Sequence, residues 1–125
     1  MPDRPLTVLI VDDNAEAARS LALLLEMHGL TVEVVSDGPA ALGRVDGAAS
    51  PDVVLLDIEL PGMDGCDVAR QLRGRLGERT PRLVALTGRG RAEDVARGLE
   101  AGFDVYLVKP ADPDQVLQAI TPGRP

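Results

Sequence analysis

Aromatic, thiol and imidazole side chains are scarce in this sequence. Its 125 residues include no tryptophan, one tyrosine, one phenylalanine, one cysteine and one histidine. The single cysteine, Cys66, cannot form a disulfide within the chain and fits a reducing compartment. With so few rings available, the hydrophobic core must consist mainly of leucine, valine, isoleucine and alanine.

Long hydrophobic runs are also missing. No stretch approaches the roughly 18 apolar residues that a membrane-spanning helix needs, so we expect no membrane insertion. The N-terminal segment Met-Pro-Asp-Arg-Pro contains no apolar signal-peptide core. We therefore expect a cytoplasmic protein.

Basic residues are outnumbered by acidic ones. The chain has 20 Asp and Glu against 13 Lys and Arg, which gives a formal net charge of −7. Direct binding to nucleic acid depends on a basic patch, so this balance argues against it. It suits a protein that binds cations or basic partners.

The chain alternates short apolar runs with stretches of helical spacing. Its length predicts one domain, which we expect to occupy residues 1–125 with a folded core at about 6–120. The runs are nearly continuously apolar, as expected of parallel strands that are covered on both faces. The predicted strands are Leu6–Val11, Thr31–Val35, Val53–Leu56, Leu83–Leu86 and Val105–Val108.

Helical spacing of apolar residues fills the intervals between these runs. Asn14 and Asp112 are expected N-caps, Gly29 and Gly102 follow helix ends, and residues 122–125 form a tail. Strict strand–helix alternation predicts an α/β fold with a doubly wound parallel sheet, because right-handed crossovers connect parallel strands. The predicted helices are Asn14–Met27, Gly38–Val45, Asp64–Leu76, Arg91–Ala101 and Pro113–Ile120.

Four of the five predicted strands end in polar residues that suit phosphoryl transfer. The carboxyl ends of parallel strands lie along one edge of a sheet, where such folds bind ligands. We therefore expect these side chains to share one crevice. In chain order they are Asp12 and Asp13, then Asp57, Thr87 and Lys109.

Three carboxylates in one crevice repel one another unless a cation lies among them. Their oxygen atoms suit Mg²⁺, whose charge together with that of Lys109 would balance all three. Asp57 would then be a nucleophile towards phosphorus, with Lys109 as a point charge and Thr87 as a hydroxyl donor. The alternative for Asp12 and Asp13 is N-capping of the helix that follows them.

Four short motifs at the predicted strand ends carry a more specific signal. They are Val11-Asp12-Asp13-Asn14, Leu56-Asp57-Ile58-Glu59-Leu60-Pro61-Gly62-Met63-Asp64-Gly65, Ala85-Leu86-Thr87-Gly88 and Tyr106-Leu107-Val108-Lys109-Pro110. In this order they resemble the receiver domain of two-component response regulators, and the likeness extends from about Leu6 to Ile120. The resemblance implies a flavodoxin-like (βα)5 fold whose five-stranded parallel sheet has the order 2-1-3-4-5.

The resemblance also implies a role for each site residue. Asp57 would accept a phosphoryl group from a phosphohistidine of a sensor histidine kinase or a histidine phosphotransfer protein. Lys109 and Thr87 would assist at the phosphoryl group. The Mg²⁺ ligands would be Asp12, Asp13, Asp57 and the backbone carbonyl of Glu59.

A conformational switch is a further implication of the resemblance. Thr87 would move towards the phosphoryl group and Tyr106 would turn inward, which would change the face formed by the fourth helix, fifth strand and fifth helix. A downstream protein or an output domain of a parent chain would bind that face. Such a signalling domain is not an enzyme beyond its own phosphorylation and dephosphorylation.

The family varies at two positions, two residues after the phosphoacceptor and two residues after the switch threonine, which are occupied here by Glu59 and Arg89. We hypothesise that they form an ion pair that partly covers the site and tunes the lifetime of the phosphate. The alternative is that both side chains are solvated. Nearby, the Lys109–Pro110 bond is a natural place for a cis peptide.

Other functions fit parts of the pattern. A small Mg²⁺-dependent phosphohydrolase would use Asp57 as nucleophile and Glu59 as second acid, although its nucleophile normally follows the first strand. A phosphate-independent interaction module would fit better if a key acid were lost, and none is. The chain fits a stand-alone regulator or a receiver derived from a hybrid sensor kinase, with Leu21, Leu24 and Leu25 near a phosphotransfer dock.

Overall fold

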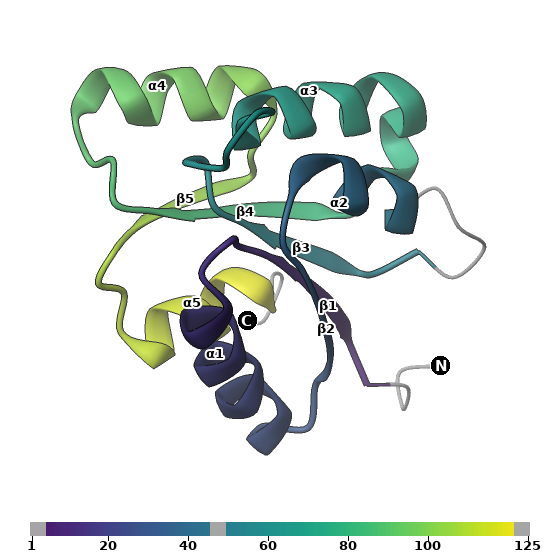
Figure 1. Ribbon diagram of the computed structural model, residues 1–125, viewed down its shortest axis with the longest axis vertical. Coiled ribbons are helices and arrows are strands. Elements are labelled where there is room, and N and C mark those ends of the chain that lie inside the picture. The colour runs from purple at the N-terminus through teal and green to yellow at the C-terminus, as the bar shows by residue number, and fades with distance from the viewer. Residues whose placement is uncertain (1–4, 46–49, 122–125) are drawn as a thin grey trace.

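The computed structural model describes residues 5–45 and 50–121 as one five-stranded sheet with helices on both faces (Figure 1). All strand pairs are parallel, and the strand order is β2-β1-β3-β4-β5. The predicted α/β fold and strand order are therefore confirmed. Most of the N-terminal segment and the whole predicted tail, residues 1–4 and 122–125, lie outside the described residues.

Strands and helices alternate along the chain as predicted. The strands are β1 (Thr7–Val11), β2 (Thr31–Val35), β3 (Val53–Leu56), β4 (Arg82–Thr87) and β5 (Val105–Val108). The helices are α1 (Ala15–Met27), α2 (Gly38–Val45), α3 (Gly65–Leu76), the short 3-10 helix η1 (Gly77–Arg79), α4 (Ala92–Ala101) and α5 (Pro113–Ile120). No helix within the described ranges is both long and apolar enough to cross a membrane.

Several observed boundaries differ from the predicted ones by one residue. Asn14 and Asp64 precede α1 and α3, because their side chains accept hydrogen bonds from backbone N–H groups three residues further on. They are therefore N-caps, outside the helix that each introduces. Thr87 belongs to β4 because it still pairs with Val108 of β5. The η1 helix had no predicted counterpart.

Each face of the sheet is covered by its own helices. Helices α2, α3 and α4 cover one face, and α1 and α5 cover the other (Figure 1). Because successive strand residues point to opposite faces, Leu9 and Val11 join the cluster under α2 and α3, whereas Val8 and Ile10 pack against α1 and α5. The buried core is aliphatic except for one phenylalanine and one cysteine, as the composition predicts.

Candidate functional site

Asp57 follows the central strand β3 at the carboxyl edge of the sheet and is only 8% exposed. Its backbone N–H donates to the carbonyl of Val11 at 3.0 Å, which ties it to β1. Oδ1 accepts a hydrogen bond from the N–H of Glu59 at 2.9 Å, and Oδ2 lies 3.2 Å from Nζ of Lys109. Both oxygens of this nearly buried carboxylate are thus held in fixed directions.

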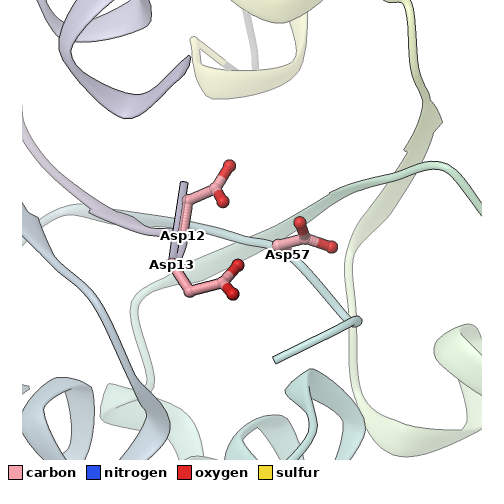
Figure 2. Close-up of side chains that lie close together, drawn as sticks. All are labelled: Asp12, Asp13 and Asp57. Atoms are coloured by element: carbon pink, nitrogen blue, oxygen red, sulfur yellow. The ribbon is translucent and has the colours of Figure 1, made fainter. Parts of the chain in front are cut away.

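Two further acids follow β1, the neighbouring strand. The carboxyl groups of Asp12, Asp13 and Asp57 gather at the ends of β1 and β3 (Figure 2). One carboxylate oxygen from each lies within 4.8 Å of the others. The cap of α1 is Asn14, whose side chain accepts from the N–H of Ala17 at 3.0 Å. The alternative in which the two acids serve as the N-cap is therefore wrong.

The donor set of this acidic cluster fits a hard divalent cation. All of its groups are carboxylates, and oxygen ligands are those that Mg²⁺ prefers. Within the described residues, the ion pairs to these acids come from Lys109 alone, so negative charge exceeds positive charge at the site. Like charges at this separation repel, and a divalent cation would remove the repulsion. Participation of the Glu59 carbonyl stays a prediction.

Lys109 follows β5, and its side chain forms ion pairs with Asp12 and Asp57. Its Nζ lies 3.2 Å from Oδ2 of Asp57 and 3.4 Å from Oδ2 of Asp12. Burial disfavours the ammonium charge, but the hydrogen bond to Asp57 and the charges of both carboxylates outweigh it, so the pKa of Lys109 is raised. Its backbone N–H donates to the carbonyl of Thr87 at 2.8 Å, and the Lys109–Pro110 peptide bond is cis.

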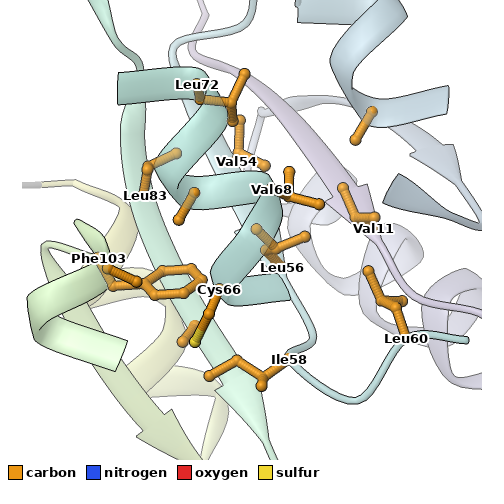
Figure 3. Packing of buried hydrophobic residues seen from close by; sticks show 14 of the residues in the cluster. Val11, Val54, Leu56, Ile58, Leu60, Cys66, Val68, Leu72, Leu83 and Phe103 are labelled. Carbon is orange, nitrogen blue, oxygen red and sulfur yellow. The ribbon is translucent and has the colours of Figure 1, made fainter. Parts of the chain in front are cut away.

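The loop after Asp57 is anchored by two apolar side chains. Ile58 and Leu60 are 3% and 6% exposed and join the buried cluster with β3 and α3 (Figure 3). Gly65 begins α3, where a Cβ would lie 2.6 Å from the carbonyl oxygen of Asp57. The sequence analysis included Gly65 in a motif but assigned it no role. Such a close approach of two backbone segments is possible only without a Cβ. The feature of the sequence that could have indicated it is a glycine directly after Asp64, the N-cap of α3.

Thr87 and Tyr106 lie on neighbouring strands and bracket the β4–α4 loop. Thr87 is 0% exposed, and its hydroxyl oxygen accepts from the N–H of Arg89 at 3.5 Å. The Tyr106 hydroxyl donates to the carbonyl of Arg89 at 2.8 Å. Burial, and next the charge of Asp94, raise the pKa of the Tyr106 phenol. Both members of the predicted switch pair therefore contact the same loop residue.

The hypothesised ion pair between Glu59 and Arg89 is present. Nε of Arg89 lies 3.1 Å from Oε2 of Glu59, and both side chains are roughly half exposed. The hydrogen bond to Glu59 raises the pKa of Arg89. Because the Arg89 carbonyl also accepts from Tyr106, one residue joins this ion pair to the switch pair. An effect of the pair on phosphate lifetime stays a prediction.

A hollow of about 310 Å³ lies beside Asp12 and Lys109, between α1 and the segment after β5. Leu21 and Leu24 of α1 line it. Leu25 is instead fully buried in the core. Of the three leucines expected near a docking surface, two line this hollow, and the third packs inside the protein.

Comparison with known proteins gives a family match. The sequence model described as "Response regulator receiver domain" matches residues 8–121. The sensory transduction protein RegX3 of Mycobacterium tuberculosis (strain ATCC 25618 / H37Rv) is 44% identical over 114 residues, which are 91% of this chain and 48% of that protein. The DNA-binding response regulator MtrA of Mycobacterium leprae is 42% identical over 113 residues, which are 90% of this chain and 48% of that protein. The chain thus spans about half the length of these relatives.

Solved structures share the architecture. A putative response regulator from Chloroflexus aurantiacus superposes with a TM-score of 0.84 at 33% identity, covering 91% of this chain and 93% of that one. The signal receiver domain of a signal transduction histidine kinase from Syntrophus aciditrophicus superposes with a TM-score of 0.82 at 32% identity, covering 91% of this chain and 86% of that one. Similar domains therefore occur both in response regulators and in a histidine kinase.

Proposed function

This chain belongs to the response regulator receiver domain family, and we propose that it is a signalling switch controlled by phosphorylation of Asp57. The observation that carries the proposal is the meeting of Asp57 with two further carboxylates and one ammonium at a single edge of the sheet. Such a site can accept a phosphoryl group and neutralise its charge.

The proposed donor is a phosphohistidine of a sensor histidine kinase or of a histidine phosphotransfer protein. One carboxylate oxygen of Asp57 forms a bond to phosphorus while the P–N bond to the imidazole breaks, and the leaving nitrogen takes up a proton. Asp57 suits this step because the Glu59 N–H and the Lys109 ammonium already orient its carboxylate. The product is an acyl phosphate on Asp57.

Lys109 and the other acids have separate proposed roles. Lys109 pairs with the negative charge that arrives with the phosphoryl group, and its raised pKa keeps it cationic at neutral pH. Asp12, Asp13 and Asp57 would hold Mg²⁺, with the Glu59 carbonyl as a further ligand. When bound, Mg²⁺ supplies charge neutralisation at the phosphoryl oxygens.

Thr87 and Tyr106 are the proposed route from the site to the surface. A phosphoryl group on Asp57 offers acceptor oxygens to the buried Thr87 hydroxyl. A shift of Thr87 would act on the loop residue Arg89, whose carbonyl holds Tyr106. The face formed by α4, β5 and α5 would change accordingly, and a downstream protein or a parent-chain output domain would bind it.

The hollow beside α1 is the proposed docking place for the phosphodonor. It opens next to Asp12 and Lys109, so a histidine carried by a protein seated there would lie near Asp57. The apolar side chains of Leu21 and Leu24 suit the apolar surface of a partner helix. This arrangement serves a stand-alone regulator and a receiver derived from a hybrid kinase equally well.

For the output we propose a protein partner in the cytoplasm and no direct contact with nucleic acid. The name of MtrA attributes DNA binding to that protein as a whole, of which this chain matches 48%. The formal net charge of −7 disfavours binding of this chain to phosphate backbones.

Labelling with a small acyl phosphate in the presence of Mg²⁺ tests the proposal. We expect one phosphoryl group per chain, loss of labelling on removal of Mg²⁺, and no labelling of Asp57→Ala. A matched control is Asp67→Ala, which removes an exposed acid of α3. Labelling of Asp57→Ala at the wild-type level would contradict the proposal. Sustained turnover of a phosphomonoester would instead favour the phosphohydrolase.

A further inference from the structure

Gly98, in the interior of α4, lies directly against the ring of Tyr106. A Cβ built at Gly98 would lie 2.6 Å from Cε2 and 2.7 Å from Cδ2 of that ring. Nonbonded carbon atoms prefer about 3.5–4.0 Å, so no side chain fits while the ring stays in place. Gly98 is buried, although its neighbours Arg97 and Leu99 are exposed.

The obstacle at this position is the ring itself. The next atom, Cδ1 of Ile58, would be 3.7 Å from the same Cβ, which is an ordinary contact. The Tyr106 side chain extends from β5, and its ring packs beside Gly98. Its hydroxyl lies 2.8 Å from the carbonyl oxygen of Arg89 in the loop before α4. Tyr106 therefore touches both the interior of α4 and the loop that leads into it.

Glycine in a helix interior destabilises the helix relative to alanine, so its presence there calls for a structural explanation. Gly74 in α3 is a useful comparison, since it is exposed and no atom lies within 4 Å of a Cβ built on it. Packing therefore requires glycine at position 98 and leaves position 74 open to larger residues.

We propose that Gly98 is a positioning residue for Tyr106: the missing side chain creates the slot that holds the ring against α4 with its hydroxyl on the Arg89 carbonyl. A larger residue at position 98 moves the ring outward or moves α4 away from the sheet. An effect of this slot on signalling depends on the proposed switch role of Tyr106. The packing itself does not depend on phosphorylation.

Denaturant unfolding of matched glycine-to-alanine variants tests the slot. We expect Gly74→Ala to shift the unfolding midpoint upward, since alanine favours the helix, and Gly98→Ala to shift it downward. In a Tyr106→Ala background the ring is gone, so Gly98→Ala should shift the midpoint upward. An upward shift for Gly98→Ala in the wild-type background, or a downward shift in the Tyr106→Ala background, would overturn the proposal.

Tyrosine fluorescence gives a second readout that overall stability does not determine. Tyr106 is the only tyrosine and the chain has no tryptophan, so the emission reports this ring alone. We expect acrylamide to quench the Tyr106 emission more strongly in Gly98→Ala than in wild type or Gly74→Ala, under conditions where all three proteins are folded. Equal quenching of the three proteins would show that the ring does not depend on Gly98.

Phosphorylation is measured separately to distinguish the two proposals. Gly98→Ala should retain labelling of Asp57, because the atoms nearest to a Cβ at Gly98 belong to Tyr106 and Ile58. We expect labelling to change the tyrosine fluorescence of wild type, and Gly98→Ala should lose that change. Failure of wild type to become labelled would refute the proposed function and leave the slot intact. An unaltered fluorescence change in labelled Gly98→Ala would refute the coupling through Gly98.

Discussion

Nζ of Lys109 lies 3.2 Å from Oδ2 of Asp57, although 52 residues separate them in the chain. The contact exists because β3 and β5, on either side of β4, end at the same edge of the sheet. Lys109 is the only lysine among the 13 Lys and Arg residues. An ammonium is a compact point charge and a guanidinium is a planar fork, so the two cations are not interchangeable at this contact.

Replacing Lys109 should slow phosphorylation without preventing folding. For Lys109→Met we expect labelling by a small acyl phosphate to slow on the order of 10²-fold, as for loss of one donor to developing negative charge. Lys109→Arg should recover only part of the rate, because its geometry differs. Time courses of labelling measure both variants, with Arg70→Met as an exposed-cation control. A wild-type rate for Lys109→Met would exclude the assigned role.

The acidic cluster predicts that one substitution raises stability without metal and reduces the stability gained from Mg²⁺. Asp13 is exposed, so Asp13→Asn should fold, and in metal-free buffer it should be more stable than wild type because repulsion is reduced. Mg²⁺ stabilises a native state that binds it, by about 2.7 kcal/mol at 100 times the dissociation constant. Wild type should therefore gain stability on addition of Mg²⁺, and Asp13→Asn should gain less.

Denaturant midpoints with and without Mg²⁺ measure these differences. Asp67→Asn is the matched control, because it also removes an exposed acid but lies on α3 outside the cluster. It should respond to Mg²⁺ as wild type does. An identical Mg²⁺ response in Asp13→Asn and wild type would rule out a metal ligand at position 13.

The Glu59–Arg89 ion pair predicts a change in phosphate lifetime. Arg89→Ala leaves Glu59 unpaired and uncovers one side of the site, so water should reach the acyl phosphate more easily. We expect dephosphorylation to be faster than in wild type, with little change in stability because the pair is exposed. Arg70→Ala, which breaks an exposed ion pair with Asp67, is the control. Equal dephosphorylation rates in Arg89→Ala and wild type would eliminate the hypothesis.

Strand positions were predictable because apolar runs and their polar ends are local features of the sequence. β2, β3 and β5 have the predicted bounds, and so do α2 and α5. Among the shifted boundaries, the starts of α1 and α3 depend on side-chain hydrogen bonds, and the end of β4 depends on the pairing of Thr87 with Val108. The expected N-cap Asn14 is confirmed, but Asp64, which caps α3 through Asp67, lies inside the predicted helix because periodicity alone does not distinguish a cap from a first helical residue.

The acidic cluster was also predictable, since topology brings the carboxyl ends of neighbouring strands together. The contacts around Tyr106 were not. Its hydroxyl binds a backbone carbonyl, that of Arg89, and its ring packs where Gly98 has no side chain. Neither contact leaves a periodic pattern or a complementary pair of side chains in the sequence. Such contacts can be found only when the backbone is placed in three dimensions.

The phenol of Tyr106 provides a pH prediction with a definite sign. Burial, and then the charge of Asp94, raise its pKa above the ordinary value of about 10. Folding therefore favours the neutral phenol, which also donates to the Arg89 carbonyl. This contribution to stability is fully present below the unfolded-state pKa and is lost as pH rises through the folded-state pKa.

Because Tyr106 is the only tyrosine, phenolate absorbance follows this group alone. We expect the titration midpoint of the folded protein to lie above that of the denatured protein. Stability should also fall more steeply on the alkaline side in wild type than in Tyr106→Phe, which lacks the ionisable hydroxyl. Lys109 is present in both proteins, so the difference between them isolates the phenol. Coincident midpoints for folded and denatured chains would mean that the ring is not held against α4.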